Sequence, residues 1–355
     1  MNASTETTHP QSSYPESFLS CDWGTSSFRL RLIRIQDGQV LHETKKNIGV
    51  KSVFLQRDPS QNTDRDKRFE SFLTRECDQL LEVAQCATTE MIMMLSGMTT
   101  SSIGWVELPY ARAPFPLDGS RVVVQSKEII TDRGRRIQCR LISGIQTEKE
   151  MMRGEETELM GVFAKERYKG LTVECLGVVP GTHSKHVRIK DGSIQSIETF
   201  MTGELLEVLC RHSVLQATAN LECVFEQEFR MNSKSQHDAF ECGVQLAKQS
   251  GLLGNLFQTR TRGVLHGSNA TDNIWFLMGL LIGDEWCRLT ARHESGIPVL
   301  IAAGSRFGEL YLKAAGIIGI EGRLSCVLPE DMDLASSEGH RMLLFSNAMM
   351  SEQDK

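Results

Sequence analysis

The stretch FLSCDWGTSSFRLRL, residues 18–32, decides the fold of this chain. It opens as an apolar run that ends at Asp22, and a Gly-Thr-Ser-Ser turn begins at Gly24. After the turn, apolar residues alternate with arginines, which is the period expected for a half-buried strand. An Asp-Gly pair at residues 37–38 is a hairpin signal that returns the chain as a third strand over residues 39–43. The stretch therefore predicts three consecutive strands with a polar turn after the first.

The same order of features returns about half a chain later. Residues 173–179 form an apolar strand that leads into Pro180, and Gly-Thr-His-Ser follows as the turn at residues 181–184. An alternating strand, an Asp-Gly hairpin at residues 191–192 and a third strand over residues 194–200 complete the second copy. Two unrelated hairpins built from common turn residues are the alternative on the pattern alone. A true repeat would impose one supersecondary unit on both halves of the chain.

The remaining stretches alternate between helical and strand patterns. Apolar residues at helical spacing predict helices over residues 69–84, 238–250, 272–289 and 336–345, and short apolar runs predict strands over residues 91–95, 298–303 and 324–328. Gly304-Ser305 interrupts the second of these runs and opens a further helix. The chain is therefore expected to be an α/β protein.

Composition limits the class of protein and its partners. The chain has 355 residues, which favours two domains because single cores rarely grow beyond about 300 residues. Its net charge of −6 argues against nucleic-acid or membrane partners, which call for a basic face. Ten scattered cysteines without a C-x-x-C pair suggest reduced thiols and a cytoplasmic location. Residues 1–17 are polar and contain no lysine or arginine, which predicts a disordered tail instead of an export signal.

The two Gly-Thr turns carry the first chemical hypothesis. Successive backbone N–H groups in such a turn form a concavity that binds phosphate oxygens, and glycine allows a close approach. The donors expected at the two turns are Gly24, Thr25, Ser26, Gly181, Thr182, His183, Ser184 and Lys185. Asp22 would hold Mg²⁺ through water, although an aspartate before a glycine is more often a simple turn former. The second copy has Pro180 before its turn and no acid there, so the two turns are not equivalent.

Three further segments are candidates for the site. Gly304-Ser305 follows a strand and opens a helix, which suits a nucleotide contact or an ordinary βα turn. In the RGEETE segment, Glu155 and Glu156 continue the apolar stripe of a helix, where either could be the general base, with Arg153 against a negative charge. A solvated first helical turn is the alternative. The loop over residues 96–105 offers hydroxyls and a tryptophan for a sugar, or is a plain polar loop.

Several motifs, taken together and in order, resemble the 2-dehydro-3-deoxygalactonokinase family of the sugar kinase/Hsp70/actin superfamily. They are DWGTSSFR at residues 22–29, Gly97-Met98 with Gly104-Trp105 and Pro109-Tyr110, MRGEET at 152–157, PGTHSK at 180–185, MTGEL at 201–205, GLLIG at 279–283 and Ala303-Gly304-Ser305. The resemblance covers roughly residues 18–345.

The resemblance implies a two-domain actin-like or hexokinase-like ATPase fold, a duplicated ribonuclease H-like unit with an interdomain cleft. The expected domains are residues 18–168, with the sugar and the metal-linked turn, and residues 169–350, with the nucleotide. The implied cofactors are ATP and Mg²⁺. The implied reaction converts a small-molecule sugar acid, 2-dehydro-3-deoxy-D-galactonate, to its 6-phosphate in galactonate catabolism. The substrate contacts taken from the motifs are Met98, Gly104, Trp105, Arg153, Thr202 and Glu204, and Thr202 is expected to cap the helix that follows it.

The chain departs from the family pattern at three places. Ser27-Phe28 stand where the family has Asn-Leu, His186 stands where tryptophan is common, and Glu150 replaces an aspartate three residues before Arg153. Glu150 therefore joins the candidates for the base, and the substrate stays open. A phosphoanhydride phosphatase or a sugar-binding regulator on the same fold are the alternatives, and a homodimer is the expected assembly.

Overall fold

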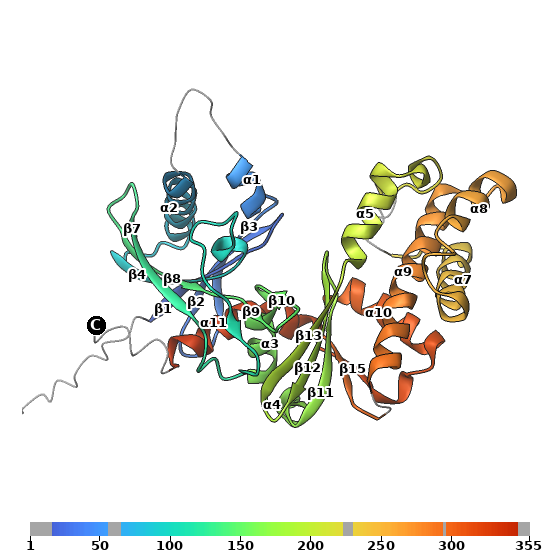
Figure 1. Ribbon diagram of the computed structural model, residues 1–355. Coiled ribbons are helices and arrows are strands. Elements are labelled where there is room, and N and C mark those ends of the chain that lie inside the picture. Colours follow the sequence, from blue (N-terminus) through green and yellow to red (C-terminus); the bar gives the residue numbers. More distant parts are fainter. Residues whose placement is uncertain (1–15, 56–64, 223–229, 294–295, 347–355) are drawn as a thin grey trace, which may run out of the picture. The chain divides into compact units, whose positions relative to one another are not determined.

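The computed structural model describes residues 16–55, 65–222, 230–293 and 296–346 (Figure 1). Residues 1–15 of the predicted tail lie outside the described residues, and Ser17 already begins the first strand. The chain divides into two compact units: Met1–Glu107 with Val124–Ile142, and Leu108–Val123 with Ser143–Lys355. This division differs from the expected boundary at residue 168, because residues 108–123 and 143–168 belong to the second unit. In the described part of the chain, no helix combines the length and apolar character needed to cross a bilayer.

The first unit is built on a six-stranded sheet in the order β3-β2-β1-β4-β8-β7. Its elements are β1 (Ser17–Trp23), β2 (Phe28–Arg34), β3 (Val40–Lys46), α1 (Val50–Leu55), α2 (Arg65–Val83), β4 (Glu90–Gly97), the 3₁₀ turn η1 (Met98–Thr100), β7 (Val124–Ile130) and β8 (Arg136–Ile142). Strands β1, β2 and β3 are antiparallel neighbours, and β1 and β4, like β4 and β8, pair in parallel. The predicted hairpins and strands of this unit are confirmed.

The second unit is built on another six-stranded sheet, in the order β15-β14-β11-β12-β13-β6. Its strands are β5 (Ala111–Arg112), β6 (Phe115–Pro116), β9 (Ile145–Gln146), β10 (Met151–Met152), β11 (Glu174–Val179), β12 (Ser184–Lys190), β13 (Ser193–Phe200), β14 (Val299–Ile301) and β15 (Leu324–Cys326). Its helices are α3 (Glu155–Ala164), α4 (Glu166–Lys169), α5 (Thr202–His212), α7 (Lys234–Ser250), α8 (Gln258–His266), α9 (Ala270–Arg292), α10 (Ser305–Ile318) and α11 (Pro329–Leu344), with the 3₁₀ turns η2 (Gly170–Thr172), η3 (Val214–Ala217) and η4 (Glu321–Arg323).

The two sheets share one topology. In each, three antiparallel strands joined by hairpins (β1–β3 and β11–β13) are followed by parallel strands beside the first of them (β4 and β8; β14 and β15). Asp191 and Gly192 both adopt positive φ, 49° and 69°, as the second Asp-Gly hairpin requires. The repeat predicted from the sequence is therefore a duplicated structural unit and not a coincidence of turn residues.

A pair of glycines extends the duplication beyond the predicted pattern. A Cβ on Gly49, just before α1, would lie 2.0 Å from the carbonyl oxygen of Thr25 in the first turn. A Cβ on Gly203, in the first turn of α5, would lie 2.7 Å from the carbonyl oxygen of Gly181 and 2.8 Å from the Cα of Thr182. Each Gly-Thr turn thus packs against a helix start that tolerates no side chain there.

Helices cover both faces of the second sheet. The helices α5, α7, α9 and α10 lie on one side of the sheet (Figure 1). Their apolar side chains form a continuous core with Leu176, Val178, Val299 and Ile301 of the sheet. On the other face, Leu159 of α3 lies against Gly177 of β11, and α3 packs closely on α11. The predicted helices are confirmed with earlier starts for α7 and α11. This packing fixes β12, α5, α9 and α10 relative to one another within the unit.

Candidate functional site

The first Gly-Thr turn follows β1 of the first unit, and the last residue of that strand, Trp23, is held firmly in the core. Trp23 is fully buried, stacks on Phe72 at a ring distance of 4.8 Å, and donates from Nε1 to the carbonyl of Ile48 at 3.0 Å. The N–H of Gly24 donates to the carbonyl of Ser27 at 2.9 Å and closes the turn. Thr25 and Ser26 are exposed, so their groups face solvent as a phosphate site requires.

Asp22 stands at the end of β1, half-buried, beside the end of β4. Its strand partner is Ser96, and a Cβ on Gly97 would lie 3.4 Å from the Asp22 carboxylate and 2.7 Å from the carbonyl of Trp23. Within the described ranges, no group of three or more His, Cys, Asp or Glu residues could hold a metal ion by protein ligands alone. A single carboxylate fits Mg²⁺, which keeps several waters and binds through substrate phosphates.

The polar loop after β4 does not present its tryptophan to a sugar. Trp105 is fully buried, with the ammonium of Lys127 4.5 Å from its ring centroid. Gly104 is buried as well, and a Cβ there would lie 2.3 Å from the carbonyl oxygen of Thr99. Met98 is half-buried at the start of the loop. The ring of Trp105 therefore packs inside the protein, and its burial does not favour the predicted contact with a sugar.

The second turn, between β11 and β12, exposes Gly181, Thr182 and His183. Open space surrounds the position that a Cβ on Gly181 would take. The backbone N–H of Glu204 donates to the carbonyl of Thr182 at 3.0 Å, and the Glu204 carboxylate contacts Nε2 of His183. The first turn of α5 thus supports the back of the turn and leaves its outer surface open to a ligand.

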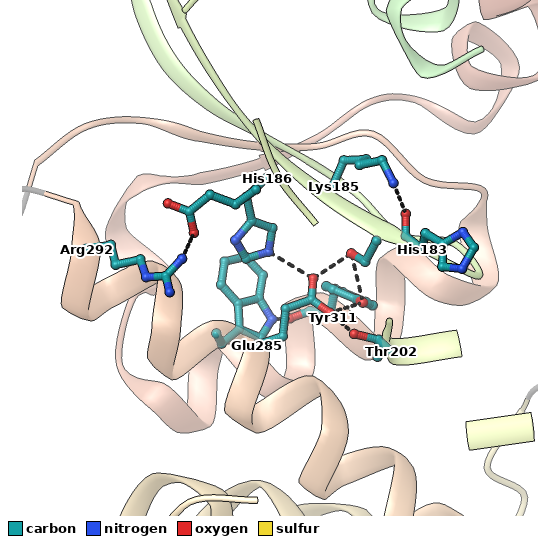
Figure 2. Close-up of polar contacts among 10 residues, drawn as sticks. His183, Lys185, His186, Thr202, Glu285, Arg292 and Tyr311 are labelled. Atoms are coloured by element: carbon teal, nitrogen blue, oxygen red, sulfur yellow. Dashed lines mark hydrogen bonds and ion pairs between the residues drawn. The ribbon is translucent and has the colours of Figure 1, made fainter. Parts of the chain in front are cut away.

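Glu285 on α9 forms a buried polar centre behind the second turn (Figure 2). Figure 2 shows His186, Thr202 and Tyr311 directed toward its carboxylate. Oε1 accepts from Ser184 Oγ at 2.6 Å and from His186 Nε2 at 2.8 Å. Oε2 accepts from Thr202 Oγ1 at 2.6 Å and from the Tyr311 hydroxyl at 2.8 Å.

These contacts change two predictions made from the sequence. Thr202 is the first residue of α5, and Met201 stands at the N-cap without a side-chain hydrogen bond, so the predicted cap is wrong. The hydroxyls of Thr202 and Ser184 both donate inward to Glu285, so neither donates to a ligand in this arrangement. Sequence reasoning missed Glu285, because it lies beside Asp284 and near Arg288 in the helix, where an acid looks like part of an ordinary charged surface.

Hydrogen bonds decide the ionisation of Glu285. Burial alone would raise its pKa, but the hydrogen bond and charge of His186 and the hydroxyls of Ser184 and Thr202 lower it below the usual value. Burial and the adjacent Glu285 charge raise the pKa of Tyr311 well above its usual value, so Tyr311 remains a hydroxyl donor. The centre is therefore an ionised carboxylate with four donors.

Lys185 links the second turn to α3. Its side chain is buried, and its ammonium donates to the carbonyl of His183 at 3.1 Å and lies 3.7 Å from Oε1 of Glu155. Glu155 is half-buried, and its Oε2 accepts the backbone N–H of Arg153 at 3.0 Å. The predicted acid segment and the predicted phosphate turn therefore meet within the second unit.

The neighbouring Glu156 has a different environment. It is fully buried, and both of its carboxylate oxygens accept the backbone N–H of Gly154, at 2.9 and 2.8 Å. Burial and the charge of Glu155 raise the pKa of Glu156 to about 8, so it holds its proton at neutral pH. Glu156 closes the start of α3 at Gly154, whose φ of 113° suits only glycine.

Arg153 and Glu150 lie before α3. The guanidinium of Arg153 stacks 4.1 Å from the ring centroid of Tyr110 and donates to the carbonyl of Leu108 at 3.3 Å. Glu150 is half-buried in the turn between β9 and β10, where its backbone N–H donates to Thr147 Oγ1 at 2.9 Å. Arg153 is thus held in place by an aromatic face, and Glu150 is held through its backbone.

A small apolar pocket opens beside the second turn. Its lining residues are Pro180, Gly181, Thr202, Gly203, Leu206, Met278, Leu281, Ile282, Phe307 and Tyr311. Gly304 is the exposed N-cap of α10 and follows the end of β14 at Ile301 after two alanines, and its Cβ position is open. Ser305 is the first residue of α10. An open turn, an open helix start and an apolar recess therefore occur together in the second unit.

Comparisons with known proteins agree with this arrangement. The family model described as 2-keto-3-deoxy-galactonokinase matches residues 22–331. A probable 2-dehydro-3-deoxygalactonokinase of Rhizobium meliloti (strain 1021) is 31% identical over 310 residues, 86% of this chain and 91% of the relative. The 2-dehydro-3-deoxygalactonokinase of Escherichia coli (strain K12) is 28% identical over 232 residues, 64% of this chain and 72% of the relative.

A solved structure agrees as well. A crystal structure of a candidate 2-dehydro-3-deoxygalactonokinase from Sinorhizobium meliloti superposes with a TM-score of 0.71 and 27% identity, covering 92% of this chain and 99% of that one. The family model spans most of the chain and includes both Gly-Thr turns, the RGEETE segment and α10. This chain belongs to the 2-keto-3-deoxy-galactonokinase family of carbohydrate kinases.

Proposed function

We propose that this chain transfers the γ-phosphoryl group of ATP to the terminal hydroxyl of 2-dehydro-3-deoxygalactonate and forms the 6-phosphate. The observation that carries the proposal is the duplicated strand–Gly-Thr turn–strand unit within a chain that the family model matches over residues 22–331. Kinases of this family use ATP, and both turns present exposed backbone and hydroxyl groups of the kind that bind phosphate.

In the second unit, the nucleotide binds at the Gly181–His183 turn. The open surface of Gly181 supports close approach of a phosphate, and the start of α10 at Gly304 offers N–H groups and the positive end of a helix dipole. The apolar pocket lined by Leu206, Met278 and Phe307 suits the nucleoside. Lys185 follows the turn by two residues in the sequence, and the contact of its ammonium with the His183 carbonyl steadies the backbone there.

In the first unit, Asp22 is the acid next to the phosphate turn and would hold Mg²⁺ through water. When bound, Mg²⁺ neutralises charge on the phosphates during transfer. Thr25 and Ser26 supply the remaining polar groups of that turn.

Glu155 is the best placed of the candidate bases. Its carboxylate is half-exposed, lies beside Lys185 and is oriented by the Arg153 N–H, so it can accept the proton of the sugar hydroxyl. As that proton moves, the hydroxyl oxygen forms a bond to the γ-phosphorus, the bond to the β-phosphate oxygen breaks, and ADP leaves. Glu156 holds its proton at neutral pH and is bonded to Gly154, so it offers no free carboxylate to accept the proton of the sugar hydroxyl. The Arg153 guanidinium is assigned to the carboxylate of the sugar acid.

The test is ADP formation by purified protein with Mg²⁺-ATP and a panel of 2-keto-3-deoxy sugar acids. We expect turnover that depends on the sugar acid and is fastest with 2-dehydro-3-deoxygalactonate. Turnover with a different member of the panel would move the assignment to that acid, and ATP hydrolysis that ignores every acid would favour a phosphatase. A cytoplasmic location and a homodimer stay predictions, and light scattering of the purified protein would measure the assembly.

A further inference from the structure

Glu285 connects four elements of the second unit through one carboxylate. It lies on α9, and its four donors come from β12, α5 and α10. Each oxygen accepts two hydrogen bonds, which fills the capacity of the group. The side chain is only 1% exposed. An ionised carboxylate at such depth is costly to bury, and apolar packing would hold the same helices together at lower cost. A contribution to folding stability therefore does not explain why a charged carboxylate is buried here.

The donors lie on both edges of the second phosphate turn. Ser184 directly follows the exposed residues Gly181–His183 and is the first residue of β12. Thr202 directly precedes Gly203, whose Cα packs against Gly181 and Thr182 without room for a side chain. Because Ser184 donates to Oε1 and Thr202 to Oε2, one rigid carboxylate sets the distance between the end of the turn and the helix start that supports it.

We propose that Glu285 is a positioning residue for the nucleotide: it holds the Gly181–His183 turn in its phosphate-binding shape through Ser184 and Thr202. The proposal rests on the assignment of this turn to the nucleotide. Glu285 is buried behind the turn and acts through Ser184 and Thr202, so its loss weakens nucleotide binding and leaves the chemical step in the remaining complex largely intact. The hydrogen bond from Tyr311 also links Glu285 to α10. The start of α10 is the other proposed nucleotide contact, so the same carboxylate holds both contacts in place.

Glu285→Gln is the sharpest substitution. It keeps the shape of the side chain but replaces one acceptor oxygen with an amide that can only donate. The amide must face either Ser184 and His186 or Thr202 and Tyr311, so at least one edge of the turn loses the hydrogen bond that it donates to a charged carboxylate oxygen. Thr202→Val is the milder partner, because it removes one donor at nearly constant volume and leaves the carboxylate in place. Thr202→Val also keeps the proposal testable if Glu285→Gln does not fold.

The measurement is the Kd for ADP by calorimetric titration in the absence of sugar acid, together with kcat and the KM for ATP. We expect Glu285→Gln to raise the Kd for ADP and the KM for ATP about tenfold or more, with kcat at saturating ATP nearly unchanged, because a hydrogen bond to a charged group is worth that much. Thr202→Val should give a smaller rise in the same direction. The matched control is Leu277→Ala, a buried residue of the same helix α9 that does not line the pocket.

Leu277→Ala should lower the Tm at least as much as Glu285→Gln and leave the Kd for ADP unchanged. The proposal is overturned if Glu285→Gln and Thr202→Val bind ADP with the wild-type Kd, or if Leu277→Ala weakens ADP binding equally. A failure of the proposed reaction looks different: wild-type protein then binds ADP but forms no phosphorylated sugar acid, while the ADP affinities of the variants still test Glu285.

Discussion

Glu155 and Glu156 are adjacent residues of one helix turn with opposite surroundings. Glu155 is half-exposed beside the Lys185 ammonium, whereas Glu156 is fully buried against Gly154. The sequence predicts that both residues continue the apolar stripe of α3. It cannot predict their different surroundings, because the partner of Glu155 is Lys185, which lies far away in the sequence on strand β12. The surroundings therefore favour Glu155 as the proton acceptor, whereas Glu156 stabilises the start of α3 through its contact with Gly154.

Glu155→Gln tests this division through the rate. Removing the proton acceptor should lower kcat by about 10²- to 10⁴-fold with ADP affinity retained. Glu156→Gln is the matched control, because an amide resembles the protonated carboxyl that the buried site already favours, and its kcat should stay near wild type. Steady-state assays of ADP release measure both. Loss of kcat in Glu156→Gln with normal kcat in Glu155→Gln would reverse the two roles.

The raised pKa of Glu156 also predicts a pH dependence of stability. Burial raises the pKa from 4.5 to about 8, so between these values the unfolded chain loses the proton that the folded protein keeps. The contribution of Glu156 to the free energy of unfolding is thus fully present below about pH 4.5 and is lost as the pH rises through about 8. Urea unfolding across this range should show the wild type losing stability relative to Glu156→Gln. A constant difference between the two proteins would contradict the buried, protonated carboxyl.

The proposed role of Asp22 in holding Mg²⁺ is tested by replacing its side chain with that of alanine. Asp22→Ala should reduce sugar-dependent ADP formation to background at any Mg²⁺ concentration, because the phosphate turn loses its metal-linked acid. Asp37→Ala is a suitable control, since its carboxylate is exposed in the hairpin at the other end of β2. Circular dichroism should report the same fold for both variants. Near-normal turnover in Asp22→Ala would remove this residue from the metal site.

At the scale of elements, strands and hairpins could be predicted because their signals are local. Alternating side chains and the Asp-Gly pairs give β1–β3 and β11–β13 without any knowledge of the tertiary structure. The Glu285 centre could not be predicted this way, because its partner Ser184 is 101 residues away and no local pattern marks the carboxylate as buried. The burial of Trp105 could not be predicted either. Its residue type suits a sugar contact, but in the folded protein the ring is fully buried and packs against the Lys127 ammonium.

The contact between α5 and the second turn makes a prediction at this scale. Gly203→Ala places a Cβ 2.7 Å from the Gly181 carbonyl, so α5 or the turn must move. We expect the KM for ATP to rise on the order of tenfold, in line with a lost set of phosphate hydrogen bonds. Gly170→Ala is the control, because Gly170 has φ of −59° and open space around its Cβ position. An unchanged KM in Gly203→Ala would show that the turn tolerates the displacement.

At the scale of the whole molecule, the repeat in the sequence is a repeat in the fold. Both units contain three antiparallel strands, a Gly-Thr turn after the first of them and a glycine packed closely against that turn. The copies diverged in chemistry: the first has Asp22 beside its turn, and the second has Lys185 and the buried Glu285 centre. The division of the chain could not be predicted as a single cut, because residues 108–123 leave the first unit and contribute β5 and β6 to the second.

The most direct measurement of the central claim is the product itself. Purified protein is incubated with Mg²⁺-ATP and 2-dehydro-3-deoxygalactonate, and ADP and phosphorylated sugar acid are quantified together by ³¹P NMR. The account predicts one phosphate ester on the terminal carbon for each ADP formed, and neither product without the sugar acid. Inorganic phosphate released in step with ADP, with no sugar phosphate, would contradict it.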